Sequence, residues 1–168
     1  MTASTSSDED RVALGPPTIY VDADACPVRA EVEKVAARHG LLVIHVSNGG
    51  LRPSRDPMIR HVVVTKGADA ADDWIVDRLK HNDLVITADV PLAARAVDCN
   101  AHVLGPTGRL FTRETIGLAV AVRDLKQHLR ETGESKGLNA SFAPRDRSAF
   151  LRELDQAVRR ALAAGQQP

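Results

Sequence analysis

The stretch TIYVDADACPV, residues 18–28, joins a short apolar run to two aspartates and then to a proline. The run 18–23 predicts a buried strand, and the segment 27–40 carries three valines at helical spacing, which predicts a helix. A first strand that ends in Asp22 and Asp24 is therefore followed at once by a helix. This strand–helix unit sets the pattern for the rest of the chain.

The same alternation continues beyond residue 40. Further strands are predicted at 41–46, 61–66, 83–89 and 101–105, with helices at 69–80 and 91–98 between them. From about residue 114 the strand pattern stops, and two amphipathic helices are predicted at 114–131 and 147–164. Strands that alternate with helices form right-handed βαβ units and a parallel sheet covered on both faces. The expected fold is a three-layer α/β/α sandwich with a C-terminal helical extension.

The domain boundaries follow from composition. Residues 1–17 are rich in Ser, Thr, Asp and Glu and end in two prolines, which predicts a disordered N-terminal arm. A single domain is expected over residues 18–163, followed by a short tail at 164–168. The chain has no apolar stretch near the ~20 residues that a membrane span needs. Its two cysteines are too few for a disulfide framework, so a cytoplasmic protein without membrane contact is expected.

Charge and aromatic content narrow the possible partners. The chain has 168 residues, with 22 basic and 22 acidic side chains, and only 3% of its residues are aromatic. Scarce aromatics argue against a platform on which bases stack. A net charge of zero gives no overall attraction to nucleic acid, so binding of that kind would need a local basic patch.

Acidic and polar residues gather where the predicted strands end. In a parallel sheet these ends, and the loops after them, line the ligand crevice. The residues at this edge are Asp22, Asp24, Ser47, Asn48, Lys66 and Asp89, and the helix after the third strand adds Asp69, Asp72 and Asp73 on one face. Several carboxylates at one edge repel unless a cation neutralises them. Hard divalent metals with oxygen ligands, Mg²⁺ or Mn²⁺, are the usual partners.

Structural interpretations of the same residues remain open. Asp69 and Asp89 are each placed to cap a helix, and Asp24 is placed to form an Asx turn. Cys26 precedes a helix N-terminus, a position that lowers a thiol pKa, and we expect it to pack or cap rather than to catalyse. The six histidines show no metal-ligand spacing and are expected at the surface or at strand starts.

Together, several segments resemble one bacterial family. They are VDADACPV (21–28), SNGG (47–50), GADAADDWIV (67–76), VITADVPLAA (85–94) and RDRSAF (145–150). Over about residues 18–160 the chain is similar to the YaiI/YqxD family, which is grouped with the PIN-like nuclease domains. The resemblance implies a PIN-like sandwich whose parallel five-stranded sheet has the order 3-2-1-4-5. The stretch GESKGLN (133–139) departs from the Gly-Gly-Pro pattern expected of the family before RDR.

The resemblance also implies a function. The acidic residues would bind Mg²⁺ or Mn²⁺ and activate a water for phosphodiester hydrolysis, with RNA a more natural substrate than DNA. The matching metal ligands are Asp22, Asp24, Asp69, Asp72, Asp73 and Asp89. Among them Asp22, Asp24, Asp73 and Asp89 are the expected catalytic residues, and Ser47, Asn48 and Lys66 are the expected substrate contacts.

Two other functions fit the sequence. The first is a phosphatase of the haloacid-dehalogenase type, in which Asp22 would be the nucleophile and Asp24 the general acid/base. Lys66 directly before the acidic residues, and a further strand that ends in Asp89, count against it. The second is a binding or regulatory protein without catalysis, which nothing in the sequence excludes.

Overall fold

A computed structural model describes residues 11–12, 15–24, 26–65, 67, 69–133 and 141–165. Within these residues, six strands form one sheet in the order β3-β2-β1-β4-β5-β6. The strands are β1 (Ile19–Asp22), β2 (Val43–Ser47), β3 (Ile59–Val63), β4 (Leu84–Ile86), β5 (His102–Leu104) and β6 (Leu110–Phe111). The first five are parallel, which confirms the predicted order 3-2-1-4-5.

The sixth strand was not expected from the sequence. It is only two residues long and runs antiparallel to β5. A tight turn makes the pairing possible: Gly108 has a φ of +90°, and the Gly105 N–H donates to the carbonyl of Arg109 at 2.8 Å. Glycine adopts this left-handed conformation without a steric penalty. A pairing this short carries no periodic pattern that could announce it.

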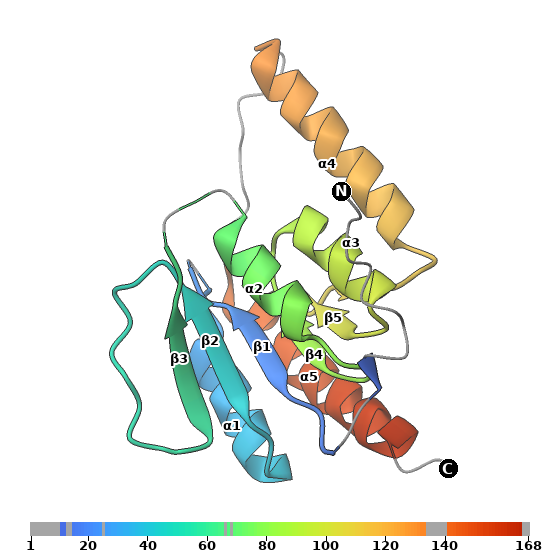
Figure 1. The fold of residues 1–168 in the computed structure, drawn as a ribbon. Coiled ribbons are helices and arrows are strands. Elements are labelled where there is room, and N and C mark those ends of the chain that lie inside the picture. Colours follow the sequence, from blue (N-terminus) through green and yellow to red (C-terminus); the bar gives the residue numbers. More distant parts are fainter. Residues whose placement is uncertain are drawn as a thin grey trace, which may run out of the picture.

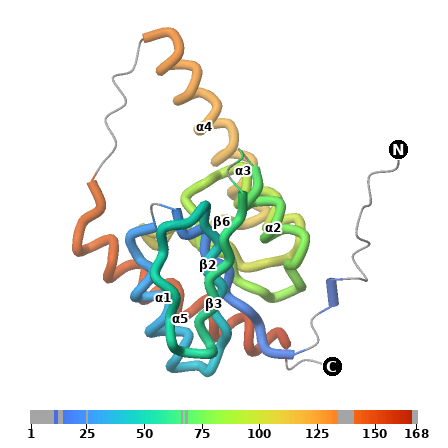
Figure 2. Tube along the Cα trace, turned by 60° about the vertical axis from the view of Figure 1, so that its left-hand side comes forward, coloured from blue at the N-terminus to red at the C-terminus, as the bar shows by residue number. Residues whose placement is uncertain are grey.

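Helices cover both faces of the sheet (Figure 1). The helices α1 (Arg29–His39) and α5 (Pro144–Gly165) pack against each other on one face, and α2 (Ala70–Arg78) and α3 (Val90–Asp98) lie on the other. The fold is therefore a three-layer α/β/α sandwich. The two C-terminal helices have different roles. α5 is part of the sandwich, whereas α4 (Ile116–Glu131) packs on α3 and extends away from the sheet (Figures 1 and 2).

The core has two halves because side chains alternate along each strand. Ile19, Val43 and Ile86 face α1 and α5, where they pack with the fully buried Phe150 and Leu154. Tyr20, Ile44 and Val85 face α2 and α3. Both halves are almost wholly aliphatic, as the composition predicts. This alternation decides which face of the sheet each functional side chain occupies.

Part of the predicted N-terminal arm is described. The Arg11 guanidinium donates to the carbonyls of Val76 and Leu79, at 2.8 and 2.9 Å, near the end of α2. The His81 N–H donates to the Arg11 carbonyl at 2.7 Å. Residues 1–10 and 13–14 of the predicted arm, residues 166–168 of the predicted tail and the segment 134–140 lie outside the described residues. No described helix is long and apolar enough to cross a membrane.

Candidate functional site: an aspartate cluster at the strand ends

The ends of β1 and β4 are joined by a buried threonine. The two strands are neighbours in the sheet, where the strand order reverses. The Thr87 hydroxyl, only 1% exposed, donates to Oδ2 of Asp22 at 2.9 Å. The Asp89 N–H donates to the same hydroxyl oxygen, also at 2.9 Å. Thr87 therefore fixes Asp22 and the backbone of Asp89 relative to each other.

Asp89 also caps α3. Its Oδ1 accepts from the Leu92 N–H at 3.1 Å, which is N-cap geometry. The cap interpretation of Asp89 is thus confirmed. The capping bond uses Oδ1 and leaves Oδ2 of the same carboxylate for another partner. Asp69 occupies the N-cap position of α2, but its side chain makes no capping hydrogen bond. Capping therefore does not account for the position of Asp69.

Asp24 ties the end of β1 to the end of β2. Its carboxylate accepts from the Asn48 N–H, at 3.1 Å to Oδ2 and 3.4 Å to Oδ1. The carboxylate itself is exposed. A hollow of about 310 Å³ opens beside it, lined by Asp22, Asp24, Cys26, Thr87, Ala88, Asp89 and Pro106. Three of the predicted aspartates therefore face one hollow, which we call the aspartate hollow.

Asp72 comes to this group from α2. It is only 8% exposed, and its pKa rises to about 6, first because of burial and then because of the charges of Asp89, Asp22 and Asp69. Burial likewise raises the pKa of Asp22, and the charges of Asp89 and Asp24 raise it further, against the Thr87 hydrogen bond, which lowers it. Like charges near one another disfavour ionisation of each. The carboxylates of Asp89, Asp22 and Asp69 are thus near enough to Asp72 for their charges to act on it.

Asp73 points elsewhere. The sequence places it on one helical face with Asp69 and Asp72, yet its side chain is 60% exposed and its Oδ1 accepts from Nη1 of Arg95 on α3 at 2.8 Å. The i and i+1 positions of a helix are about 100° apart, so only Asp72 turns toward the sheet. The structure brings together Asp22, Asp24, Asp72 and Asp89, with Asp69 near Asp72, and gives Asp73 an arginine partner.

The three predicted substrate contacts differ in their exposure to solvent and in whether the structure describes them. Ser47 is 1% exposed, and its hydroxyl accepts from the Gly49 N–H at 3.2 Å, so it shapes the turn after β2. Asn48 is exposed next to Asp24. Lys66 lies outside the described residues. Ser47 shapes the turn after β2, and the backbone N–H of Asn48 in that turn holds the Asp24 carboxylate.

Cys26 packs against the core as expected, but the direction of its thiol pKa shift differs from the expected one. It lines the aspartate hollow, but α1 begins only at Arg29. Burial raises the pKa of the Cys26 thiol, and the nearby carboxylates of Asp22 and Glu31 add to the rise. The expectation of a lowered pKa is therefore wrong, because desolvation outweighs the helix terminus.

A basic hollow lies next to the N-terminus of α3. It has a volume of about 270 Å³ and is lined by Val90, which follows Asp89 directly, and by Ala119 and Val122 of α4. Its polar lining is Arg109, Arg123, Lys126, Gln127 and Arg130. A chain with no net charge thus gathers several basic side chains in one hollow, and the lining residue Val90 follows Asp89 in the sequence.

One group of residues was missed by the sequence analysis. In the part of the chain that the structure describes, a single set of three or more His, Cys, Asp or Glu has ligand atoms all within 4.8 Å of one another: Glu33, His45 and His61. His45 has no exposed surface and lies within β2, so its expected place at the surface or a strand start is wrong. The predicted strands 41–46 and 61–66 do not place the two histidines at matching positions, so the sequence offered no signal for this pair; the observed register of β2 and β3 brings them together.

Comparisons with known proteins support the resemblance seen in the sequence. The family model described as "Uncharacterized BCR, YaiI/YqxD family" matches residues 20–160. A UPF0178 protein of Mesorhizobium japonicum is 80% identical over 87% of this chain and 94% of its own length. A UPF0178 protein of Agrobacterium fabrum is 66% identical over 86% and 94%, respectively. No solved structure matches the chain. The chain belongs to the YaiI/YqxD family.

Proposed function

We propose that the protein is a divalent-metal-dependent phosphodiester hydrolase, a PIN-like nuclease, with RNA as its substrate in preference to DNA. The observation that carries the proposal is the convergence of Asp22, Asp24, Asp72 and Asp89 at the switch point of the sheet. Ligand sites of open parallel sheets lie at this point. The preference for RNA rests on the resemblance to PIN-like nucleases alone.

The chemistry of these residues suits a hard divalent cation, which would have to draw the carboxylates together, because among the described residues no three of these carboxylates have ligand atoms all within 4.8 Å of one another. Mg²⁺ and Mn²⁺ prefer carboxylate oxygens. Burial and three neighbouring carboxylates raise the pKa of Asp72, so its charged form is unfavourable without a counter-charge. A cation would stabilise this ionised form, and Asp22, Asp24, Asp72 and Asp89 are the candidate ligands.

Each side chain has a distinct task in this proposal. A bound Mg²⁺ or Mn²⁺ supplies Lewis-acid polarisation of a phosphoryl oxygen and lowers the pKa of a water. Thr87 holds the Asp22 carboxylate in one orientation, and the α3 cap holds Asp89. The exposed Asp24 is the candidate acceptor of the proton that the attacking water loses.

The basic hollow supports a nucleic acid as the substrate. Arg109, Arg123 and Lys126 would contact backbone phosphates of a strand whose scissile phosphate occupies the aspartate hollow. Such contacts position a strand without reading its sequence. The local basic patch required by the neutral net charge is thus available, and binding should weaken as salt rises.

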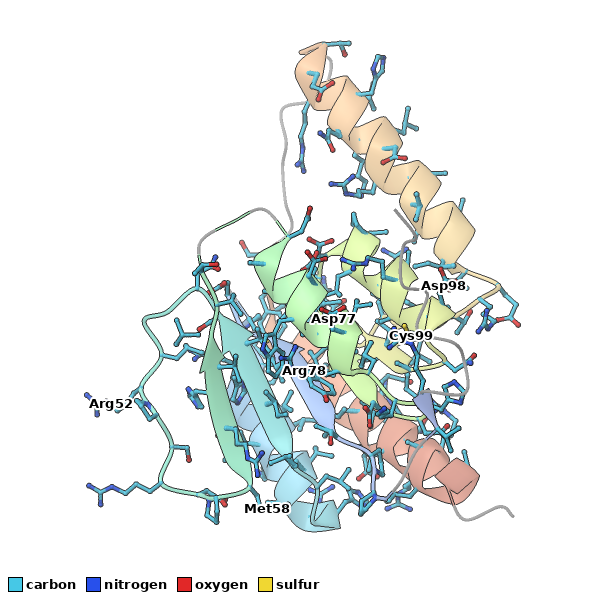
Figure 3. The ribbon with its side chains drawn as sticks, in the orientation of Figure 1. Arg52, Met58, Asp77, Arg78, Asp98 and Cys99 are labelled. Atoms are coloured by element: carbon cyan, nitrogen blue, oxygen red, sulfur yellow. The ribbon has the colours of Figure 1, made fainter. Side chains whose placement is uncertain are left out.

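Cleavage of a labelled single-stranded RNA tests the proposal. Wild type is incubated with Mn²⁺, Mg²⁺ or EDTA, next to Asp22→Asn and a matched Asp77→Asn control. Asp77 lies on α2, as Asp72 does, but outside the cluster (Figure 3). We expect metal-dependent cleavage by wild type and Asp77→Asn and none by Asp22→Asn. Equal cleavage by all three proteins would contradict the proposal.

The same samples separate the alternative functions. A single-stranded DNA of the same sequence measures the expected preference for RNA. A phosphatase of the haloacid-dehalogenase type would release phosphate from small monoesters and carry a hydroxylamine-sensitive phosphate on Asp22. A binding protein would retain the RNA without cutting it, whatever metal is present.

A further inference from the structure

A histidine pair lies on the other face of the sheet. His45 of β2 and His61 of β3 are directly paired in the parallel register. The alternation of β2 places Val43 in the core under α1 and α5, and His45, two residues on, faces the same side. The two imidazole rings have centroids 5.1 Å apart at an interplanar angle of 64°.

Helix α1 places a carboxylate over this pair. Nε2 of His45 lies 2.9 Å from Oε1 of Glu33, and one ligand atom of each of the three residues lies within 4.8 Å of the others. Glu33 follows Val32 of the buried valine stripe by one position, so α1 presents it at the edge of its packed face. Its side chain is 34% exposed and retains room to move.

Hydrogen bonding leaves the pair incomplete. Nδ1 of His45 and Nδ1 of His61 are both buried and have no hydrogen-bond partner among the described residues. A buried polar atom without a partner costs about 1–3 kcal/mol. A structural histidine would use both of its nitrogens, as most buried polar groups do. The Glu33 contact gives Nε2 of His45 a partner and leaves the Nδ1 atoms of His45 and His61 without one among the described residues.

The donor set belongs to a different class of metal from that of the aspartates. Two imidazoles and one carboxylate are the three protein ligands of many catalytic zinc sites, which keep a fourth position open. Imidazole favours Zn²⁺ and its neighbours over Mg²⁺. Burial, first of all, lowers the pKa of His45, although the Glu33 contact opposes the shift. A neutral imidazole is the form that binds metal.

Two of the three residues, Glu33 and His61, are reached from solvent, and His45 lies buried behind them. A hollow of about 590 Å³ is lined by Glu33 and His61 together with Cys26, Arg29, Arg52 and Ser54. Arg52 lies on the loop between β2 and β3, at the open edge of the sheet (Figure 3). Two arginines in the wall give this hollow a positive character, so an anion or a water is the natural occupant of an open coordination position.

We propose that Glu33, His45 and His61 form a second metal site, selective for Zn²⁺ over Mg²⁺ and Mn²⁺, whose open position faces the arginine-lined hollow. The ligand atoms, which lie within 4.8 Å of one another, need small shifts to reach tetrahedral geometry with metal–ligand bonds of roughly 2.0–2.1 Å. The partly exposed Glu33 can make this adjustment. The site is independent of the proposed hydrolysis, because the aspartates Asp22 and Asp72 lie toward α2 and α3.

Calorimetric titration of the metal-free full chain with ZnCl₂ tests the site. The variants are Glu33→Gln and His61→Ala, with His128→Ala as the matched control, because His128 is exposed on α4. Circular dichroism checks that each variant is folded. We expect one Zn²⁺ per chain in wild type and in the control, and affinity more than about tenfold weaker in Glu33→Gln and His61→Ala.

Two further measurements keep the test decisive. In wild-type protein, Zn²⁺ should shift the imidazole ¹⁵N resonances of His45 and His61 and leave that of His128 in place, which requires no variant to fold. Asp22→Asn should keep its Zn²⁺ affinity even if it loses hydrolysis, so the two proposals fail separately. Absence of Zn²⁺ binding, or binding that leaves both ring resonances unchanged, would overturn the second site.

Discussion

The two faces of the sheet carry two kinds of polar cluster. The aspartate cluster opens into a hollow, and burial together with the charges of neighbouring carboxylates raises the pKa of Asp22 and of Asp72. The group Glu33, His45 and His61 is compact, with buried nitrogens and a direct contact between carboxylate and imidazole. The difference is physical: like charges stay apart without a cation, whereas a neutral imidazole and a carboxylate attract each other. One chain thus offers a hard-cation site and a site for a borderline metal.

The largest expected effect is on catalysis. Asp22→Asn combined with Asp89→Asn removes two carboxylates from the aspartate cluster and should abolish metal-dependent RNA cleavage. The loss of activity should exceed the roughly 10–100-fold loss that follows when a residue supporting a metal ligand is replaced. His61→Ala should cleave at the wild-type rate in Mn²⁺. A double variant that retained full activity would remove the aspartate cluster from consideration.

The next largest effect is on stability, which should depend on Mn²⁺ through the aspartate cluster and on Zn²⁺ through the histidine site. A metal that binds only the native state stabilises it by about 2.7 kcal/mol at a hundred times its Kd. Thermal melts should show that Mn²⁺ stabilises wild type and His61→Ala but not the Asp22→Asn, Asp89→Asn double variant. At a few equivalents, Zn²⁺ should stabilise wild type and the double variant but not His61→Ala. Equal melting temperatures with and without either metal would contradict both sites.

Asp72 provides a pH test of the metal-free protein. Its folded pKa of about 6 lies above the ordinary value of 3.8 for an aspartate, so the folded state binds a proton more tightly than the unfolded chain does. The free energy of unfolding should therefore fall as pH rises from about 4 to 6 and level off above that range. Asp72→Asn should remove this fall and raise stability at pH 8 by about 2 kcal/mol.

Urea unfolding in EDTA at several pH values measures this effect. Asp77→Asn is the control, because it changes an exposed aspartate on the same helix. If Asp72→Asn and Asp77→Asn gave parallel pH profiles, the raised pKa that burial and the neighbouring carboxylates give Asp72 would not be a feature of the protein in solution.

The fold and the aspartate cluster were largely readable from the sequence, and the histidine pair was not. Strand-end aspartates can be placed because a parallel topology brings all strand ends to one edge. The contact between His45 and His61 depends on the register of β2 and β3, which the loop between them sets. The contact between Glu33 and His45 depends in addition on the rotation of α1 about its axis over the sheet. Neither the register nor that rotation is encoded in a local pattern.

The smallest expected effect concerns Asp73, for which sequence and structure differ most. Helical spacing groups it with Asp72, but its carboxylate pairs with Arg95 at the surface. An exposed ion pair is worth about 0.2–1 kcal/mol, so Asp73→Asn should cost less than about 1 kcal/mol and leave Mn²⁺ affinity unchanged. Arg95→Gln should show the same small loss, and the double variant should add little to either.

A Mn²⁺ titration of Asp73→Asn then decides the membership of the cluster. Arg95 also lowers the pKa of Asp72, opposing the carboxylates around it, so the arginine already offsets part of their repulsion. If Asp73→Asn weakened Mn²⁺ binding tenfold or more, the side chain would have to leave Arg95 for the metal. The released guanidinium would then be free to contact a substrate phosphate, and the cluster would include the residue that helical spacing predicts.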